Sequence, residues 1–161
     1  MKDGFIKVAA GIPECTVADI SANISEIKRI IDKADRQNIN ILALPELCVT
    51  GYTCGDLFFS DTLLTGAKSA LTELAKFTEG KYPVVILGLP LLLRSKLYNC
   101  AAVLSDGKIL GIVPKTHMPN YSEFYEQRQF TSGLLAPDDS ITLDGLTAVS
   151  YTHLTLPTNR E

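Results

Sequence analysis

Two charged residues of this sequence occupy positions from which they could take part in acid–base chemistry. Glu46 follows the apolar segment 39–44, and Lys115 follows the apolar segment 108–113. Open α/β sheets place their sites at the carboxyl ends of buried strands. A carboxylate in low-dielectric surroundings gains affinity for a proton and can act as a general base, and a fixed ammonium can stabilise a developing oxyanion. We therefore interpret Glu46 as a candidate base and Lys115 as a candidate oxyanion-stabilising cation.

Each of these residues also has a simpler interpretation. The position of Glu46 alone favours a solvated loop acid, because polar residues commonly follow strands. A lysine at the end of a strand is more often an exposed, solubilising residue. Neither residue, taken singly, identifies a catalytic site.

A third group of candidate residues combines aromatic and charged side chains in one short segment. Its members are Tyr121, Ser122, Glu123, Phe124, Tyr125, Glu126, Gln127, Arg128, Gln129 and Phe130. Such a segment could form the wall of a polar pocket in which Arg128 pairs with a carboxylate. The alternative is a surface helix with an aromatic stripe, and the composition alone does not separate the two.

The elements that must position these residues alternate between strands and helices. Apolar runs predict strands at 5–10, 39–44, 82–89, 97–104 and 108–113, with the third buried on both faces. Asp106 and Gly107 predict a hairpin between the last two strands. Apolar residues at three- and four-residue steps predict helices at 17–37 and 62–77, capped by Thr16 and Asp61. This order predicts an α/β layer fold.

Composition and charge exclude several classes of protein. The chain has 161 residues, 46% hydrophobic residues and a net charge of −3, so we expect a packed core and no nucleic-acid partner. No apolar run approaches the roughly 18 residues of a membrane span, and residues 1–7 do not resemble a signal peptide. The cysteines, Cys15, Cys48, Cys54 and Cys100, lack metal-ligand spacing. We expect a cytoplasmic protein without a metal site and without a membrane partner.

The order of the candidate motifs resembles the nitrilase, or carbon–nitrogen hydrolase, superfamily. Leu44-Pro45-Glu46 comes first, then Lys115, then the segment 124–128. More closely, segments 45–59 and 114–126 are similar to the amidase half of glutamine-dependent NAD synthetases. The resemblance covers nearly all of residues 4–147.

This resemblance implies a role for five residues. Glu46 matches the general base of the superfamily, Lys115 the lysine that stabilises the tetrahedral intermediate, and Glu126 a supporting carboxylate. Tyr121 and Phe124 match residues that help to hold glutamine. The implied chemistry is attack of a cysteine thiolate on the glutamine side-chain amide, release of ammonia and hydrolysis of the thioester by water.

The same resemblance implies a fold and a domain organisation. The expected fold is a nitrilase-type α-β-β-α sandwich, of which residues 1–148 would form the N-terminal part. Residues 149–161 lose the pattern, and we hypothesise that this tail is not native to the domain. A C-terminal synthetase domain would receive the ammonia and use ATP and Mg²⁺, whereas this segment itself needs no cofactor. The full-length protein would form a homo-oligomer.

The nucleophile of the implied reaction is absent from this sequence. No cysteine follows Lys115, and none of the cysteines before it occupies the nucleophile position of the superfamily. Cys48 and Cys54 flank Glu46, but buried cysteines are usually small core residues. We therefore expect the 161-residue chain to be inactive. Two alternatives stay open: a free-standing hydrolase of another small amide or nitrile, and a non-catalytic pseudo-amidase module.

Overall fold

A mixed five-stranded sheet forms the centre of the molecule, with strand order β1-β2-β3-β4-β5. The computed structural model describes residues 4–119, 125–136, 140–143 and 146–149. The strands are β1 Val8–Ala10, β2 Ile41–Ala43, β3 Val84–Leu93, β4 Lys96–Ser105 and β5 Lys108–Pro114. The first three strands are parallel, and β4 and β5 continue the sheet in antiparallel pairing. The predicted α/β architecture is confirmed.

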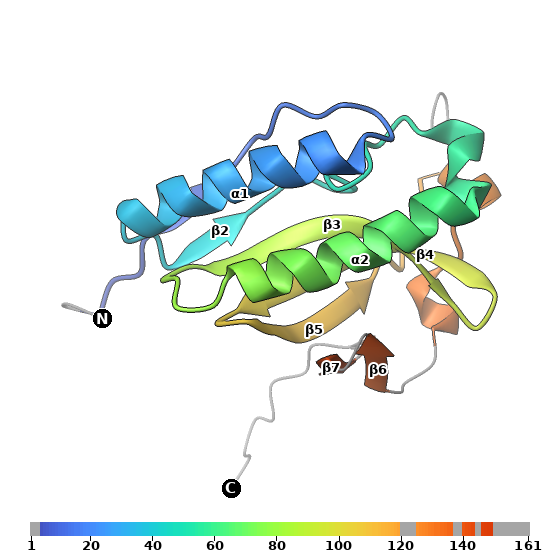
Figure 1. Cartoon of the computed structure of the whole chain (residues 1–161). Helices are drawn as coiled ribbons and strands as arrows, with labels where there is room; N and C mark the ends of the chain where they lie inside the picture. The colour runs from blue at the N-terminus through green and yellow to red at the C-terminus, as the bar shows by residue number, and fades with distance from the viewer. Residues whose placement is uncertain (1–3, 120–124, 137–139, 144–145, 150–161) are drawn as a thin grey trace, which may run out of the picture.

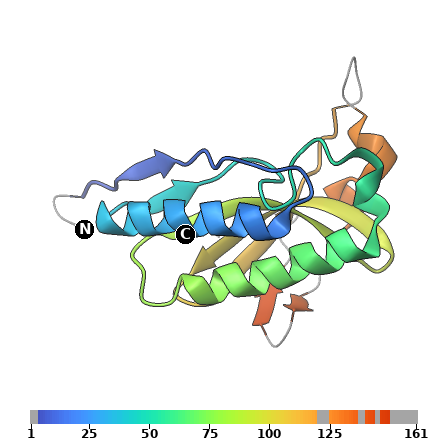
Figure 2. The same cartoon turned by 45° about the horizontal axis from the view of Figure 1, so that its top comes forward.

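Two long helices, α1 Ile20–Arg36 and α2 Asp61–Phe77, lie side by side on one face of this sheet (Figure 1). The described residues also form three short helices: η1 Gly55–Phe59, α3 Glu126–Gln129 and η2 Gly133–Leu135. The strands β6 Ser140–Leu143 and β7 Leu146–Val149 pair as a separate antiparallel ribbon. This ribbon lies against β5, below the sheet in both views (Figure 2).

The main core lies between the sheet and the two helices. Val85, Leu87 and Leu89 of β3 are fully buried on the helix face of the sheet, where they join Ile27 and Leu71 in one cluster. Val84 and Ile86, on the other face of the same strand, are only half-buried. The expectation that this strand is buried on both faces is therefore wrong for the face opposite the helices. The described residues form one α-β half of the expected sandwich.

The first helix begins later than the sequence predicts. Ala18 has a φ of 61°, in the left-handed region, so the helix cannot extend back through it. Asp19 is the N-cap, and its carboxylate accepts the N–H of Ala22 at 2.9 Å, so the predicted cap at Thr16 was wrong. Similarly, Asp61 is the first residue of α2 and not its cap, which is Ser60.

Both turns that connect β3, β4 and β5 have two consecutive residues with positive φ. At the predicted hairpin, Asp106 and Gly107 have φ of 46° and 77°, as a type I′ turn requires. The turn between β3 and β4 uses Arg94 and Ser95, with φ of 45° and 65°. Because Arg-Ser is not a usual sequence for this turn, the prediction ended β3 at residue 89 and missed the longer hairpin. That hairpin carries Asn99 to a position opposite Pro90.

Candidate active site

The loop that carries Glu46 lies directly on β3. A side-chain Cβ at Gly88 would come 2.3 Å from the backbone nitrogen of Leu47, so only glycine permits this approach. The N–H of Val49 donates to the carbonyl of Gly88 at 3.3 Å and holds the loop there. Glu46 is therefore fixed where β2 ends, above the sheet.

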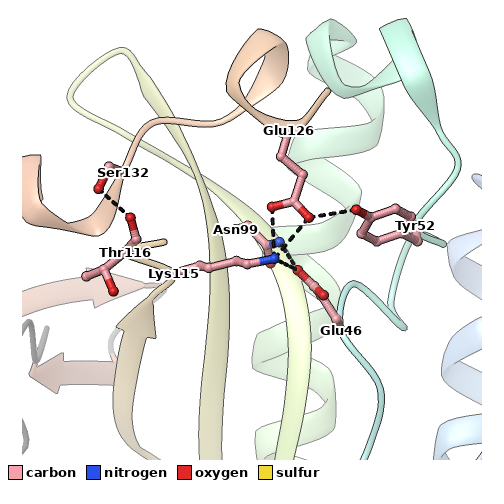
Figure 3. A network of polar contacts seen from close by, with 7 residues as sticks. All are labelled: Glu46, Tyr52, Asn99, Lys115, Thr116, Glu126 and Ser132. Atoms are coloured by element: carbon pink, nitrogen blue, oxygen red, sulfur yellow. Dashed lines mark hydrogen bonds and ion pairs between the residues drawn. The ribbon is translucent and has the colours of Figure 1, made fainter. Parts of the chain in front are cut away.

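Lys115 is held by its backbone on two sides. Its N–H donates to the carbonyl of Asn99 in β4 at 2.8 Å, and its own carbonyl accepts the N–H of Gly133 at 2.8 Å. The hydroxyl of Ser132 donates to the carbonyl of Thr116 at 2.7 Å, next to this bond (Figure 3). The segment that follows β5 is thereby fixed between β4 and η2.

The amine of Lys115 bridges two carboxylates. Its Nζ lies 2.7 Å from Oε1 of Glu46 and 2.9 Å from Oε2 of Glu126 (Figure 3). Asn99 donates through Nδ2 to Oε1 of Glu46, and the hydroxyl of Tyr52 donates to Oε1 of Glu126 at 2.6 Å. The network therefore joins Asn99 of β4 and Glu126 of α3 with residues of the segments that follow β2 and β5.

Burial differs sharply between the two carboxylates of this network. The side chain of Glu126 is 5% exposed, whereas that of Glu46 is 42% exposed. A buried carboxylate needs a counter-charge and hydrogen-bond donors, which Lys115 and Tyr52 supply to Glu126. Glu46 is the carboxylate that solvent and a ligand can reach.

The surroundings of Lys115 keep it protonated. Partial burial acts to lower the pKa of its amine, but hydrogen bonds to Glu46 and Glu126, together with their charges, outweigh burial and raise the pKa above its ordinary value. A lysine in this state supplies a permanent positive charge and hydrogen-bond donors to a negatively charged group.

A cavity of about 570 Å³ opens beside this network, within the size range of small-molecule sites. Most of its wall is apolar, and the polar side chains of Glu46, Asn99 and Lys115 reach it together. The remaining lining residues come from the loop after β2, from β3 and β4, and from the end of β5 and the segment that follows it. A carboxylate and an ammonium at one cavity are suited to proton transfer and to stabilisation of an oxyanion.

Comparison of the sequence with known protein families identifies the family of the chain. The carbon–nitrogen hydrolase family matches residues 7–153 of the chain. The chain belongs to the carbon–nitrogen hydrolase family. Among curated relatives, the glutamine-dependent NAD(+) synthetase of Mycobacterium tuberculosis is 35% identical over 130 residues, which are 81% of this chain and 19% of that protein. The glutamine-dependent NAD(+) synthetase of Aquifex aeolicus is 36% identical over 118 residues, or 73% of this chain and 20% of that protein.

A solved structure agrees with the family assignment. The crystal structure of a glutamine-dependent NAD(+) synthetase from Cytophaga hutchinsonii superposes with a TM-score of 0.83 at 30% identity, covering 90% of this chain and 25% of that one. The nitrilase-type fold expected from the sequence is thus confirmed for this hydrolase segment. The segment spans about a fifth of the length of the curated relatives that it matches.

None of the cysteines of this hydrolase segment lies in surroundings that favour a thiolate. Burial raises the pKa of Cys48 to about 11, and burial also raises the pKa of Cys15, Cys54 and Cys100. Cys48 donates to the carbonyl of Gly88 at 3.6 Å, and Cys54 donates to the carbonyl of Thr50 at 3.1 Å. Because the thiolate is the nucleophilic form, these thiols are poor nucleophiles. Their surroundings agree with the interpretation of Cys48 and Cys54 as packing residues.

The structure brings together three of the predicted site residues, Glu46, Lys115 and Glu126. Tyr121 and Phe124, expected to hold glutamine, lie outside the described residues. Arg128 pairs with a carboxylate, that of Asp56 at 3.0 Å, but both side chains are well exposed and lie outside the cavity wall. Such surface pairs contribute little free energy.

Asn99, Tyr52 and Gly88 were missed by the sequence analysis. Asn99 is a polar residue within the apolar run 97–104, and that break in the pattern could have identified it. Tyr52 carried no comparable signal, because its partner Glu126 lies 74 residues away in the sequence.

Among the residues that the structure describes, no group of three or more His, Cys, Asp or Glu side chains could hold a metal ion. In the same residues, no helix is both long enough and apolar enough to cross a membrane.

Proposed function

We propose that this chain is the N-terminal part of a glutamine-hydrolysing amidase domain that supplies ammonia for NAD synthesis from deamido-NAD. The observation that carries the proposal is the amine of Lys115 between Glu46 and Glu126, beside a cavity of about 570 Å³ that Glu46 and Lys115 line. The relatives are glutamine-dependent NAD(+) synthetases, which supports glutamine as the substrate and NAD synthesis as the destination of the ammonia.

In the proposed reaction each member of the network has one task. Glu46 takes the proton of a cysteine thiol that a segment outside these 161 residues supplies. The thiolate attacks the amide carbon of glutamine, Lys115 stabilises the resulting oxyanion, and ammonia leaves with a proton returned by Glu46. Water then hydrolyses the thioester to glutamate. Glu126 holds the amine of Lys115 and does not exchange protons with the substrate.

The full-length protein would carry the remaining functions. A C-terminal synthetase domain would use ATP and Mg²⁺ to activate deamido-NAD, and the ammonia would attack the activated group. We expect this protein to be a cytoplasmic homo-oligomer without nucleic-acid or membrane partners. The gene sequence downstream of codon 161 tests this organisation, because a free-standing amidase or nitrilase would lack a nucleotide-binding domain.

The central test separates the two nitrogen sources in the full-length protein. Glu46→Gln and Lys115→Met should abolish NAD formation from glutamine and leave NAD formation from ammonium chloride unchanged, because only the former requires amide hydrolysis. Lys28→Met is a matched control, since Lys28 also forms an ion pair, at 2.6 Å with Glu73, and its side chain is likewise 28% exposed. Glutamine-dependent synthesis that survives in both site variants contradicts the proposal.

The 161-residue chain by itself should release no ammonia from glutamine. Without a thiolate there is no covalent step, and the remaining acid and base provide only weak catalysis. Ammonia release can be followed with a coupled glutamate dehydrogenase assay. Turnover by the purified chain that disappears in Glu46→Ala would show that a group within this chain replaces the cysteine.

A further inference from the structure

We propose that Asn99 is a positioning residue for the acid–base pair, an inference that rests on the proposed amidase function. Its side-chain Nδ2 donates to Oε1 of Glu46 at 2.5 Å, and its backbone carbonyl accepts the N–H of Lys115 at 2.8 Å. One residue in the middle of β4 is therefore bonded to both members of the pair. Figure 3 shows the side chain of Asn99 beside those of Glu46 and Lys115.

The burial of Asn99 shows that its amide is unusual for this strand. Asn99 is 2% exposed, and the residue opposite it in the sheet is Pro90, which has no N–H to offer. A buried amide costs free energy unless it is hydrogen bonded, and an apolar side chain would satisfy the sheet equally well. The hydrogen bond to Glu46 offsets this cost. An amide side chain at this position therefore serves the contact with the carboxylate, since the sheet does not require it.

The geometry also distinguishes the two oxygens of Glu46. Nδ2 of Asn99 and Nζ of Lys115 both reach Oε1, at 2.5 and 2.7 Å, and two donors use the lone pairs of that oxygen. Among the described residues, no donor is bonded to Oε2. Oε2 is therefore the oxygen that receives the thiol proton, while the sulfur keeps the bonding electron pair as a thiolate. Asn99 fixes the orientation of the carboxylate without adding a charge.

A second buried asparagine provides an internal comparison. Asn23 is 0% exposed, and its side-chain amide donates only to backbone carbonyls, those of Thr16 at 2.9 Å and Val49 at 3.0 Å. Asn23 therefore has a structural role in the same molecule. A measurement that gives different results for Asn99 and Asn23 therefore reports the contact with the carboxylate, because both side chains are buried.

The first test is spectroscopic and uses the full-length protein with labelled asparagine side chains, and it does not depend on glutamine hydrolysis. Bonds from an amide to a carboxylate are stronger than bonds to a neutral carbonyl. One side-chain amide proton of Asn99 should resonate downfield of those of Asn23 and exchange slowly. Glu46→Gln, at a side chain that is 42% exposed, should shift this signal upfield and leave Asn23 unchanged. An Asn99 signal that is unaffected by Glu46→Gln overturns the proposed contact.

The second test measures kinetics in the full-length protein. Asn99→Ala keeps the backbone bond to Lys115 and removes only the side-chain donor. It should lower kcat for glutamine hydrolysis about 10- to 100-fold, as expected for a misplaced catalytic group, with little change in KM and in ammonium-dependent synthesis. Asn23→Ala should reduce thermal stability without this loss of kcat. A wild-type kcat in Asn99→Ala refutes the positioning role.

The two tests also separate this inference from the function on which it rests. If the wild-type full-length protein does not hydrolyse glutamine, the proposed function fails, and the positioning role fails with it. The spectroscopic result then still decides whether Asn99 is bonded to Glu46. If glutamine is hydrolysed, the kinetics of Asn99→Ala decide the positioning role directly.

Discussion

At the residue scale, one cation of the site forms ion pairs with two carboxylates that differ in solvent exposure. Lys115 contacts Glu126, which is buried, and Glu46, which is accessible from the cavity. The buried carboxylate cannot be solvated, so it depends on the amine. The accessible carboxylate can exchange a proton with a ligand while the amine stays in place.

Replacing Lys115 should therefore destabilise the fold more than replacing an ordinary surface lysine would. Lys115→Met leaves Glu126 buried without a counter-charge, which costs about 3 kcal/mol in comparable buried pairs. Urea denaturation of the 161-residue chain measures this loss. The double variant Lys115→Met/Glu126→Gln should recover much of the stability, because the uncompensated charge is gone. Equal stability of Lys115→Met and the wild-type chain would contradict the proposed role of the ion pair.

At the element scale, the site depends on where strands end and on how closely a loop approaches the sheet. The carboxyl ends of β2 and β5 lie at the same end of the sheet, with β3 and β4 between them. Glu46 and Lys115 therefore face each other across those two strands. Gly88 in β3 allows the Glu46 loop to lie in contact with the strand. The β3–β4 hairpin then carries Asn99 between the two charged residues.

Gly88→Ala should displace the loop that carries Glu46. The added methyl would lie 2.3 Å from the backbone nitrogen of Leu47, and overpacking of this kind costs about 2 kcal/mol or more. Gly66→Ala in α2 is a suitable control, because its methyl would meet only the flexible end of Ile20 and alanine favours helix. Thermal unfolding of both variants measures the difference. Similar melting temperatures for both variants would show that the loop yields without cost.

At the scale of the whole molecule, the described residues form a sheet with helices on one face only. Val84, Ile86 and Val113, on the opposite face, are half-buried, and Val8 on the edge strand is 64% exposed. In an α-β-β-α sandwich this face would be covered by the second sheet. The α-β half seen here therefore leaves apolar surface accessible to solvent.

The 161-residue chain should consequently bind the hydrophobic dye ANS and associate at high concentration. Fluorescence titration and light scattering measure the two effects. A longer protein that includes the rest of the hydrolase domain should bind less dye per molecule. Equal dye binding by both proteins would indicate that this sheet face is not the surface that the second sheet covers.

Much of this arrangement could be predicted from local patterns in the sequence. Periodic apolar residues predicted α1 and α2, apolar runs predicted the five strands of the main sheet, and Asp106-Gly107 predicted a hairpin. The bounds of the elements were less accurate, because Ala18 and the Arg94-Ser95 turn adopt positive φ without the residues that usually indicate it.

The sequence by itself indicated the two charged residues of the candidate site: a glutamate and a lysine, each just after an apolar strand, in the order of the carbon–nitrogen hydrolases. Only the tertiary structure decided which other side chains complete it. Asn99 lies 53 residues from Glu46, and Tyr52 lies 74 residues from Glu126. Such contacts follow from sheet order and register, which bring distant segments together and leave no periodic pattern along the chain.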